Sequence, residues 1–104
     1  MVMIPPTQGI YAILVPDQRF SPRGFAVLYF GEAGDISQRL TSQHEKLSAW
    51  YREAAGRTLY FAYHVTPGMT DQQRRNAECE LINAYLPPCN ERVDRPLYSA
   101  FRRP

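Results

Sequence analysis

Two apolar runs decide the fold of this chain: GIYAILV over residues 9–15 and FAVLYFG over residues 25–31. Both runs are rich in β-branched and aromatic residues, a composition typical of β-strands. The polar, turn-forming segment 16–24 (PDQRFSPRG) joins them. Because two such runs joined by a polar loop are typical of an antiparallel pair, we expect them to form the first two strands of a sheet.

A helix and a third strand are expected next in the chain. Asp35 is a good helix N-cap, and Gln38 three residues later completes a capping-box pattern. Apolar residues then recur at helical spacing, which predicts one helix from Asp35 to about Gly56, with the glycine as its C-cap. The following run LYFAYHV, over residues 59–65, is aromatic and predicts a third strand.

A second helix is expected after the turn at residues 66–70. Thr70 and Gln73 repeat the capping-box pattern, and the helix runs to about Tyr85, before the proline pair 87–88 stops it. The resulting β-β-α-β-α order predicts an α/β fold, in which helices flank a small, three-stranded, largely antiparallel sheet.

Length and composition are those of one small globular domain. The chain has 104 residues, of which 44% are hydrophobic and 21% charged, so a single core is feasible. We expect residues 1–92 to form the domain and residues 93–104 a basic tail. No stretch approaches the roughly 20 apolar residues of a membrane-spanning helix, so no membrane partner is expected. Cys79 and Cys89 make neither a disulfide framework nor a zinc pattern, which predicts free thiols in a reducing cytoplasm.

The net charge of +2 is concentrated at the end of the chain. Residues 91–104 carry four arginines and two acidic residues, whereas the first 90 residues carry eight basic and eight acidic ones. A basic tail either contacts phosphates or is simply solvated. The balanced body is unusual for a nucleic-acid binder, which ordinarily presents a basic face.

Helical geometry singles out one carboxylate. Leu81, Ile82 and Tyr85 define the apolar face of the second expected helix, and Glu78 precedes them by three, four and seven residues. Glu78 therefore shares their face, whereas Glu80 lies about 200° round the helix and is expected to face solvent. A carboxylate on the core side needs a partner. Glu78 is therefore expected to form a salt bridge with an arginine, to bind a metal ion or to act as a general base.

Two residues of the first expected helix are candidates for phosphate contact. Arg39 is expected in the first turn of this helix. Helix N-termini bind phosphate, and a guanidinium there can add two hydrogen bonds to the same phosphate. The alternative is a solvated surface arginine. His44 lies between Leu40 and Leu47 on the apolar side. That position is typical of a partly buried, hydrogen-bonded histidine, or of a ligand.

Five elements occur in a characteristic order: GIY at residues 9–11, YFG at residues 29–31, Arg39 ten residues after the second tyrosine, Glu78 in an E-x-x-L-I pattern, and Asn90 twelve residues later. This set resembles the GIY-YIG nuclease family, which includes the nuclease domain of the bacterial excision-repair incision protein. The resemblance covers residues 7–92 and implies a metal-dependent endonuclease that hydrolyses DNA phosphodiester bonds.

The resemblance also implies roles for individual residues, although tyrosines in strands are ordinarily packing residues. Tyr11 would be the general base, or would orient the attacking water, and Tyr29 would position that water and the phosphate. Arg39 would neutralise charge in the transition state. Glu78 would hold one Mg²⁺ or Mn²⁺ ion, and Asn90 would brace the site by hydrogen bonds.

The sequence departs from the family pattern at three positions. Phe30 replaces isoleucine. Glu32 stands where several relatives have lysine or a small residue, so it would repel a phosphate or approach the metal. His44, implied as a substrate-binding residue, follows Arg39 by five residues, whereas some relatives place a histidine at four.

Two other functions remain open. The balanced charge of the body fits a catalytically weak or inactive module that binds nucleic acid or a partner protein. A nuclease acting on RNA is a third possibility. The chain has no room for a separate targeting domain, so a homodimer or a protein partner would supply specificity.

Overall fold

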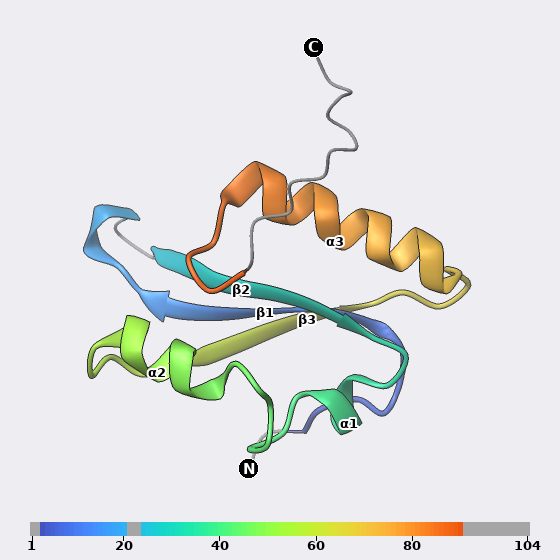
Figure 1. Cartoon of the computed structure of the whole chain (residues 1–104), viewed down its shortest axis with the longest axis horizontal. Coiled ribbons are helices and arrows are strands. Elements are labelled where there is room, and N and C mark those ends of the chain that lie inside the picture. Colours follow the sequence, from blue (N-terminus) through green and yellow to red (C-terminus); the bar gives the residue numbers. More distant parts are fainter. Residues whose placement is uncertain (1–2, 21–23, 91–104) are drawn as a thin grey trace.

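Three strands form one antiparallel sheet in the computed structural model, which describes residues 3–20 and 24–90. The strands are β1 (Gly9–Pro16), β2 (Phe25–Ala33) and β3 (Tyr60–Val65), in the spatial order β2-β1-β3. The helices are η1 (Gln18–Phe20), α1 (Ile36–Arg39), α2 (Leu47–Ala54) and α3 (Asp71–Tyr85). Figure 1 shows α3 on one face of the sheet and α1 and α2 on the other.

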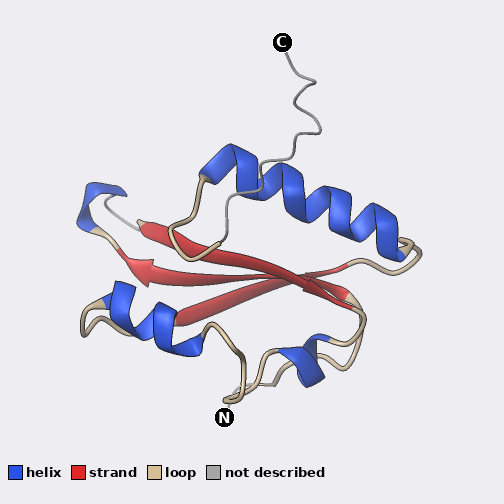
Figure 2. Ribbon diagram, viewed as in Figure 1, coloured by secondary structure: helices blue, strands red, loops and turns tan. Residues whose placement is uncertain are grey.

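The predicted α/β class and the antiparallel sheet are confirmed. β1 is the central strand and pairs with β2 and with β3, both antiparallel. Figure 2 shows the three strands in red as a layer between the helices. Tyr11 is the cross-strand neighbour of Gly31 on β2 and of Tyr63 on β3. The GIY motif on β1 and the YFG motif on β2 therefore lie side by side in the sheet.

Helix α3 begins and ends as predicted. The Thr70 hydroxyl accepts a hydrogen bond from the Gln73 amide at 3.0 Å, and the Gln73 side chain accepts one from the Thr70 amide at 2.8 Å. This reciprocal capping box satisfies two amide groups that the helix itself leaves unpaired. The last residue of α3 is Tyr85, just ahead of the two prolines.

The prediction of one helix from Asp35 to Gly56 is wrong, because the segment forms two short helices, α1 and α2. Asp35 is the N-cap as expected, but its side chain accepts from the Ser37 amide instead of forming the reciprocal bond with Gln38. The chain leaves the helix at Leu40, and the Thr41 hydroxyl then accepts a hydrogen bond from the Gln43 amide. Such local side-chain bonds compete with helix continuation.

The core lies between the sheet and the α1–α2 side. Alternate residues of β1 point to that side, and Trp50 of α2 is 2% exposed within the same cluster. The buried members are Tyr11, Ile13, Val15, Leu28, Tyr29, Ile36, Trp50 and Ala54. Two of the predicted site residues, the motif tyrosines, are therefore also core residues.

Three further expectations concern the C-terminal tail, membrane-spanning helices and the two cysteines. The predicted basic tail, residues 93–104, and its boundary with the domain lie outside the described residues. Within the described part, no helix is long and apolar enough to cross a membrane. Cys79 and Cys89 are both free thiols, as predicted.

Candidate active site

Both motif glycines are fixed by close contacts. A Cβ atom at Gly31 would overlap the Tyr11 ring, which lies across β2 at that point. A Cβ atom at Gly9 would overlap the main-chain oxygen of His64 and the side chain of Ile36. Since only glycine leaves this room, the glycines of GIY and YFG are needed to seat the Tyr11 ring and to pack β1 against its neighbours.

A directed hydrogen bond fixes the Tyr11 hydroxyl. Nε2 of His44 lies 2.8 Å from the Tyr11 hydroxyl, and Nδ1 of His44 accepts a hydrogen bond from the Lys46 amide at 3.1 Å. Burial, followed by the nearby Arg39 charge, lowers the pKa of His44, so the ring is neutral near pH 7. Because Nδ1 accepts, the single ring proton lies on Nε2, and His44 donates to the Tyr11 oxygen.

The two motif tyrosines are neighbours in the core, with ring centroids 6.2 Å apart. Burial, followed by the Tyr29 phenol, raises the pKa of Tyr11 above its usual range. Burial raises the pKa of Tyr29 to about 12, and a hydrogen bond from Tyr11 lowers it slightly. The Arg39 guanidinium lowers the pKa of both phenols.

Arg39 lies at the end of α1 and not in the first turn of a long helix. Helix α1 has only four residues, so the expected contribution of a helix N-terminus to phosphate binding at Arg39 is wrong. The guanidinium instead makes two hydrogen bonds to Glu45, at 2.7 Å and 2.5 Å. The Arg39 side chain remains 38% exposed, which leaves it accessible to a ligand.

Glu78 is a partly buried carboxylate of α3. It lies on α3, partly buried, whereas Glu80 on the same helix is exposed, as the helical geometry predicts. Among the described residues, the Glu78 carboxylate has no hydrogen bond or ion pair. Burial raises the pKa of Glu78 to about 7; the Glu32 carboxylate raises it further, and Arg39 lowers it. An anion destabilised in this way favours a bound cation.

The arginine salt bridge expected as one alternative for Glu78 is not formed within the described residues. Arg39 is bound to Glu45, as described above. Arg74, one helical turn before Glu78, is bound to Glu32 at 2.7 Å and to Asp71 at 2.8 Å. Both nearby guanidinium groups are therefore occupied by other carboxylates.

Glu32 is neutralised by a buried arginine. Arg74 is 3% exposed, and its Nε donates to Glu32 while a second nitrogen donates to the Gln8 side chain at 3.3 Å. This cluster joins the start of α3 to β2 and to the residue before β1. The positive charge of Arg74 therefore weakens the repulsion of phosphate that was expected of Glu32.

Asn90 is hydrogen-bonded to the outer edge of β2. Its side chain accepts from the Phe30 amide at 2.8 Å and donates to the Phe30 carbonyl at 2.9 Å. The Cys89 amide donates to the Leu28 carbonyl at 2.9 Å. These hydrogen bonds pair the outer edge of β2 at Leu28 and Phe30, the two residues that flank Tyr29.

The residues present fit one divalent cation held by Glu78. Within residues 3–20 and 24–90, no group of three or more His, Cys, Asp or Glu side chains gathers to bind a metal. A single carboxylate nevertheless suits Mg²⁺, which keeps several waters and takes one or two carboxylates. A shallow depression of about 530 Å³ opens beside Arg39, lined also by Glu32 and by residues 33–35.

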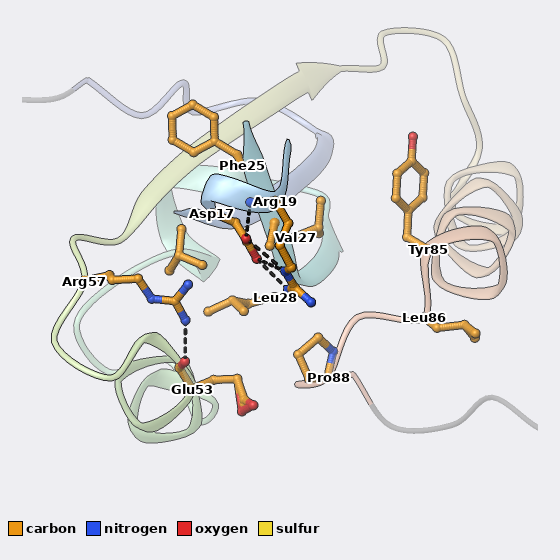
Figure 3. Close-up of a pocket in the computed structure, with 12 residues that line it drawn as sticks. Asp17, Arg19, Phe25, Val27, Leu28, Glu53, Arg57, Tyr85, Leu86 and Pro88 are labelled. Atoms are coloured by element: carbon orange, nitrogen blue, oxygen red, sulfur yellow. Dashed lines mark hydrogen bonds and ion pairs between the residues drawn. The ribbon is translucent and has the colours of Figure 1, made fainter. Parts of the chain in front are cut away.

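A second cavity, of about 480 Å³, contains none of the predicted site residues. Figure 3 shows its charged groups: Arg19 is paired with Asp17, and Arg57 donates to main-chain oxygens, including that of Glu53. Phe25 belongs to its apolar wall. Since Asp17, Arg19 and Arg57 already have partners, we do not assign the active site to this cavity.

Sequence reasoning missed two residues of the site. Glu45 follows Arg39 by six residues, and a continuous helix would have placed the two on different faces. Only the break between α1 and α2 brings them together. Arg74 could have been found, because it precedes Glu78 by four residues and therefore shares its helical face.

Solved structures have the same fold over most of this chain. The magnesium-bound GIY-YIG N-terminal endonuclease domain of UvrC from Thermotoga maritima is 24% identical, with a TM-score of 0.56; the match covers 85% of this chain and 88% of that domain. A tyrosine-to-phenylalanine mutant of the same domain, bound to its catalytic divalent cation, gives 24% identity, a TM-score of 0.58 and coverage of 86% and 89%. No protein-family model and no curated protein sequence matches. This chain therefore has the fold of a GIY-YIG endonuclease domain.

Proposed function

We propose that this protein is a metal-dependent endonuclease that hydrolyses phosphodiester bonds of DNA. The observation that carries the proposal is Glu78, a partly buried carboxylate with no partner among the described residues. Its charge raises the pKa of both tyrosines, and the Arg39 charge lowers the pKa of Glu78 itself. Such a grouping of an unpaired anion, a guanidinium and two phenols is what phosphoryl transfer by metal and arginine requires.

The chain's own residues supply binding and proton transfer. Glu78 would hold the Mg²⁺ or Mn²⁺ ion, which when bound neutralises charge on the phosphate. Arg39 binds the phosphate and stabilises the added charge of the transition state. One of the two phenols would act as the phenolate, which the Arg39 charge favours, and would take a proton from the attacking water as the water oxygen bonds to phosphorus and the bond to the leaving sugar oxygen breaks. The leaving oxygen then takes a proton from solvent.

The hydrogen-bond directions favour different roles for the two tyrosines. Since His44 donates to the Tyr11 oxygen, the Tyr11 proton is free to be donated onward, and the neighbouring Tyr29 phenol would be its acceptor. We therefore propose that Tyr11 orients the attacking water and that Tyr29 binds this water and accepts its proton. The His44 side chain has no exposed surface, so it acts through Tyr11 and not by direct contact with substrate.

Plasmid nicking tests this function. The purified protein is incubated with supercoiled plasmid and Mg²⁺ or Mn²⁺, and Glu78→Gln is compared with the matched control Glu80→Gln on the exposed face of α3. We expect nicking by the wild type and by the control, and a loss of at least about 100-fold in Glu78→Gln. Absence of nicking by the wild type, or full nicking by Glu78→Gln, would refute the proposal.

A binding module without catalysis is the second candidate. The balanced charge over the first 90 residues supports it, because electrostatics supplies most nucleic-acid affinity. This alternative predicts salt-dependent binding to DNA, no cleavage, and the same affinity in Glu78→Ala. Parallel assays with RNA and DNA of one sequence distinguish the two substrates. A second copy of this chain or a partner protein would supply sequence specificity.

A further inference from the structure

The Arg39–Glu45 pair has a particular geometry. Nη1 of Arg39 donates to one carboxylate oxygen of Glu45, and Nη2 donates to the other. The carboxylate therefore binds the terminal edge of the guanidinium with two parallel bonds. Such a fork fixes the plane of the guanidinium as well as its position.

Binding to Glu45 leaves a second edge of Arg39 for another ligand. A guanidinium has five N–H donors, and the fork uses two of them. Within the described residues, Nε of Arg39 has no hydrogen-bond partner. Nε and one terminal nitrogen form a second bidentate edge, which matches two oxygens of a phosphodiester.

The main chain at Glu45 is held by the residue before it. The His44 amide donates to the Thr41 carbonyl, and the His44 carbonyl accepts from the Leu47 amide. The His44 ring is buried and donates to Tyr11. Glu45 thus extends from a fixed point beside the tyrosines, whereas Arg39 ends a helix of only four residues.

We propose that Glu45 is a positioning residue, which holds the terminal edge of Arg39 so that its Nε edge is ready to bind the scissile phosphate. This proposal rests on the proposed nuclease function. A competing role, in which Glu45 occupies the place of the phosphate, fits less well, because the fork leaves the Nε edge open. An ion pair this exposed would also be a weak competitor.

Steady-state kinetics on a labelled oligonucleotide with Mn²⁺ separates these roles. We expect Glu45→Gln to lower kcat about tenfold without raising KM, because the arginine is bound less accurately. Glu45→Asp keeps the charge with a shorter reach and should recover part of that loss. Glu53→Gln, at an exposed position on α2, removes the same charge and should change neither constant. An unchanged kcat in Glu45→Gln, or a lower KM with full kcat, would overturn the proposal.

A second measurement does not depend on turnover. Side-chain ¹⁵N NMR of the metal-free protein follows the Arg39 nitrogens during titration with inorganic phosphate. We expect separate, slowly rotating Nη signals in the wild type that persist while phosphate shifts Nε, and averaged Nη signals in Glu45→Gln.

A freely rotating guanidinium in the wild type, or release of the Nη signals by phosphate, would overturn the positioning role. Failure of the wild type to cut DNA would instead refute the nuclease function, and the titration would still decide how Glu45 and phosphate share Arg39.

Discussion

Two arginine–glutamate pairs lie near Glu78, and they differ in their exposure to water. Arg74 is 3% exposed and binds Glu32, Asp71 and Gln8. The Arg39 side chain is 38% exposed and, among the described residues, binds only Glu45. A buried ion pair is costly to break, whereas an exposed one contributes little to stability. The comparison indicates that Arg74 supports the fold and that Arg39 is available for ligands.

The largest expected effect is on stability at Arg74. Replacing it by methionine keeps the volume but leaves Glu32 without its partner, so Arg74→Met should lower the free energy of unfolding by about 3 kcal/mol. The neighbouring Arg75→Met, at an exposed position, is the matched control and should change it by less than about 0.5 kcal/mol. Urea denaturation measures both. Equal stability of the two variants would break the contrast.

Arg39 should show the opposite behaviour. Arg39→Ala removes a group that stabilises the transition state, so kcat should fall by at least about 100-fold. Its unfolding free energy should change by less than about 1 kcal/mol, because the lost ion pair is exposed. Kinetics and urea denaturation are measured on the same preparation, with Arg52→Ala on α2 as the control. A loss of stability like that of Arg74→Met would show that Arg39 is structural.

The smallest expected effect concerns Glu78, the carboxylate that neither arginine binds. Its pKa is raised from 4.5 to about 7 in the folded protein, so the folded state binds the proton more tightly than the unfolded state. In the absence of metal, stability should therefore fall as the pH rises from about 4.5 to about 7. The change should be about 1 kcal/mol, because water screens a partly exposed group.

Glu78→Gln should remove this part of the pH dependence and be more stable than the wild type at pH 8. Urea denaturation in EDTA across this pH range measures the slope, with Glu80→Gln as the control. An identical slope in the wild type and Glu78→Gln would mean that Glu78 titrates normally.

The sequence was sufficient for those parts of the fold that depend on neighbouring residues. The three strands are contiguous apolar runs, and the start of α3 is a capping box, so each is encoded within a few residues. The face of Glu78 followed from helical periodicity. These local signals required no knowledge of the rest of the chain.

The break between α1 and α2 could not be predicted in the same way. Leu40 and Leu47 fit a continuous helical stripe, but the chain leaves the helix at Leu40 and the Thr41 hydroxyl then accepts from the Gln43 amide. His44, in the segment after the break, contacts Tyr11, which is 33 residues away in the chain, and helical periodicity carries no signal of such a contact. The position of Glu45 beside Arg39 depends on the break, so it does not follow from helical periodicity either.

The central claim is that Glu78 holds a divalent cation beside the paired tyrosines, and a Mn²⁺ soak of wild-type crystals tests it most directly. We expect an anomalous density peak at the Glu78 carboxylate, absent from crystals of Glu78→Gln soaked in the same way. No peak at Glu78 in the wild type, or a peak that persists in Glu78→Gln, would contradict it.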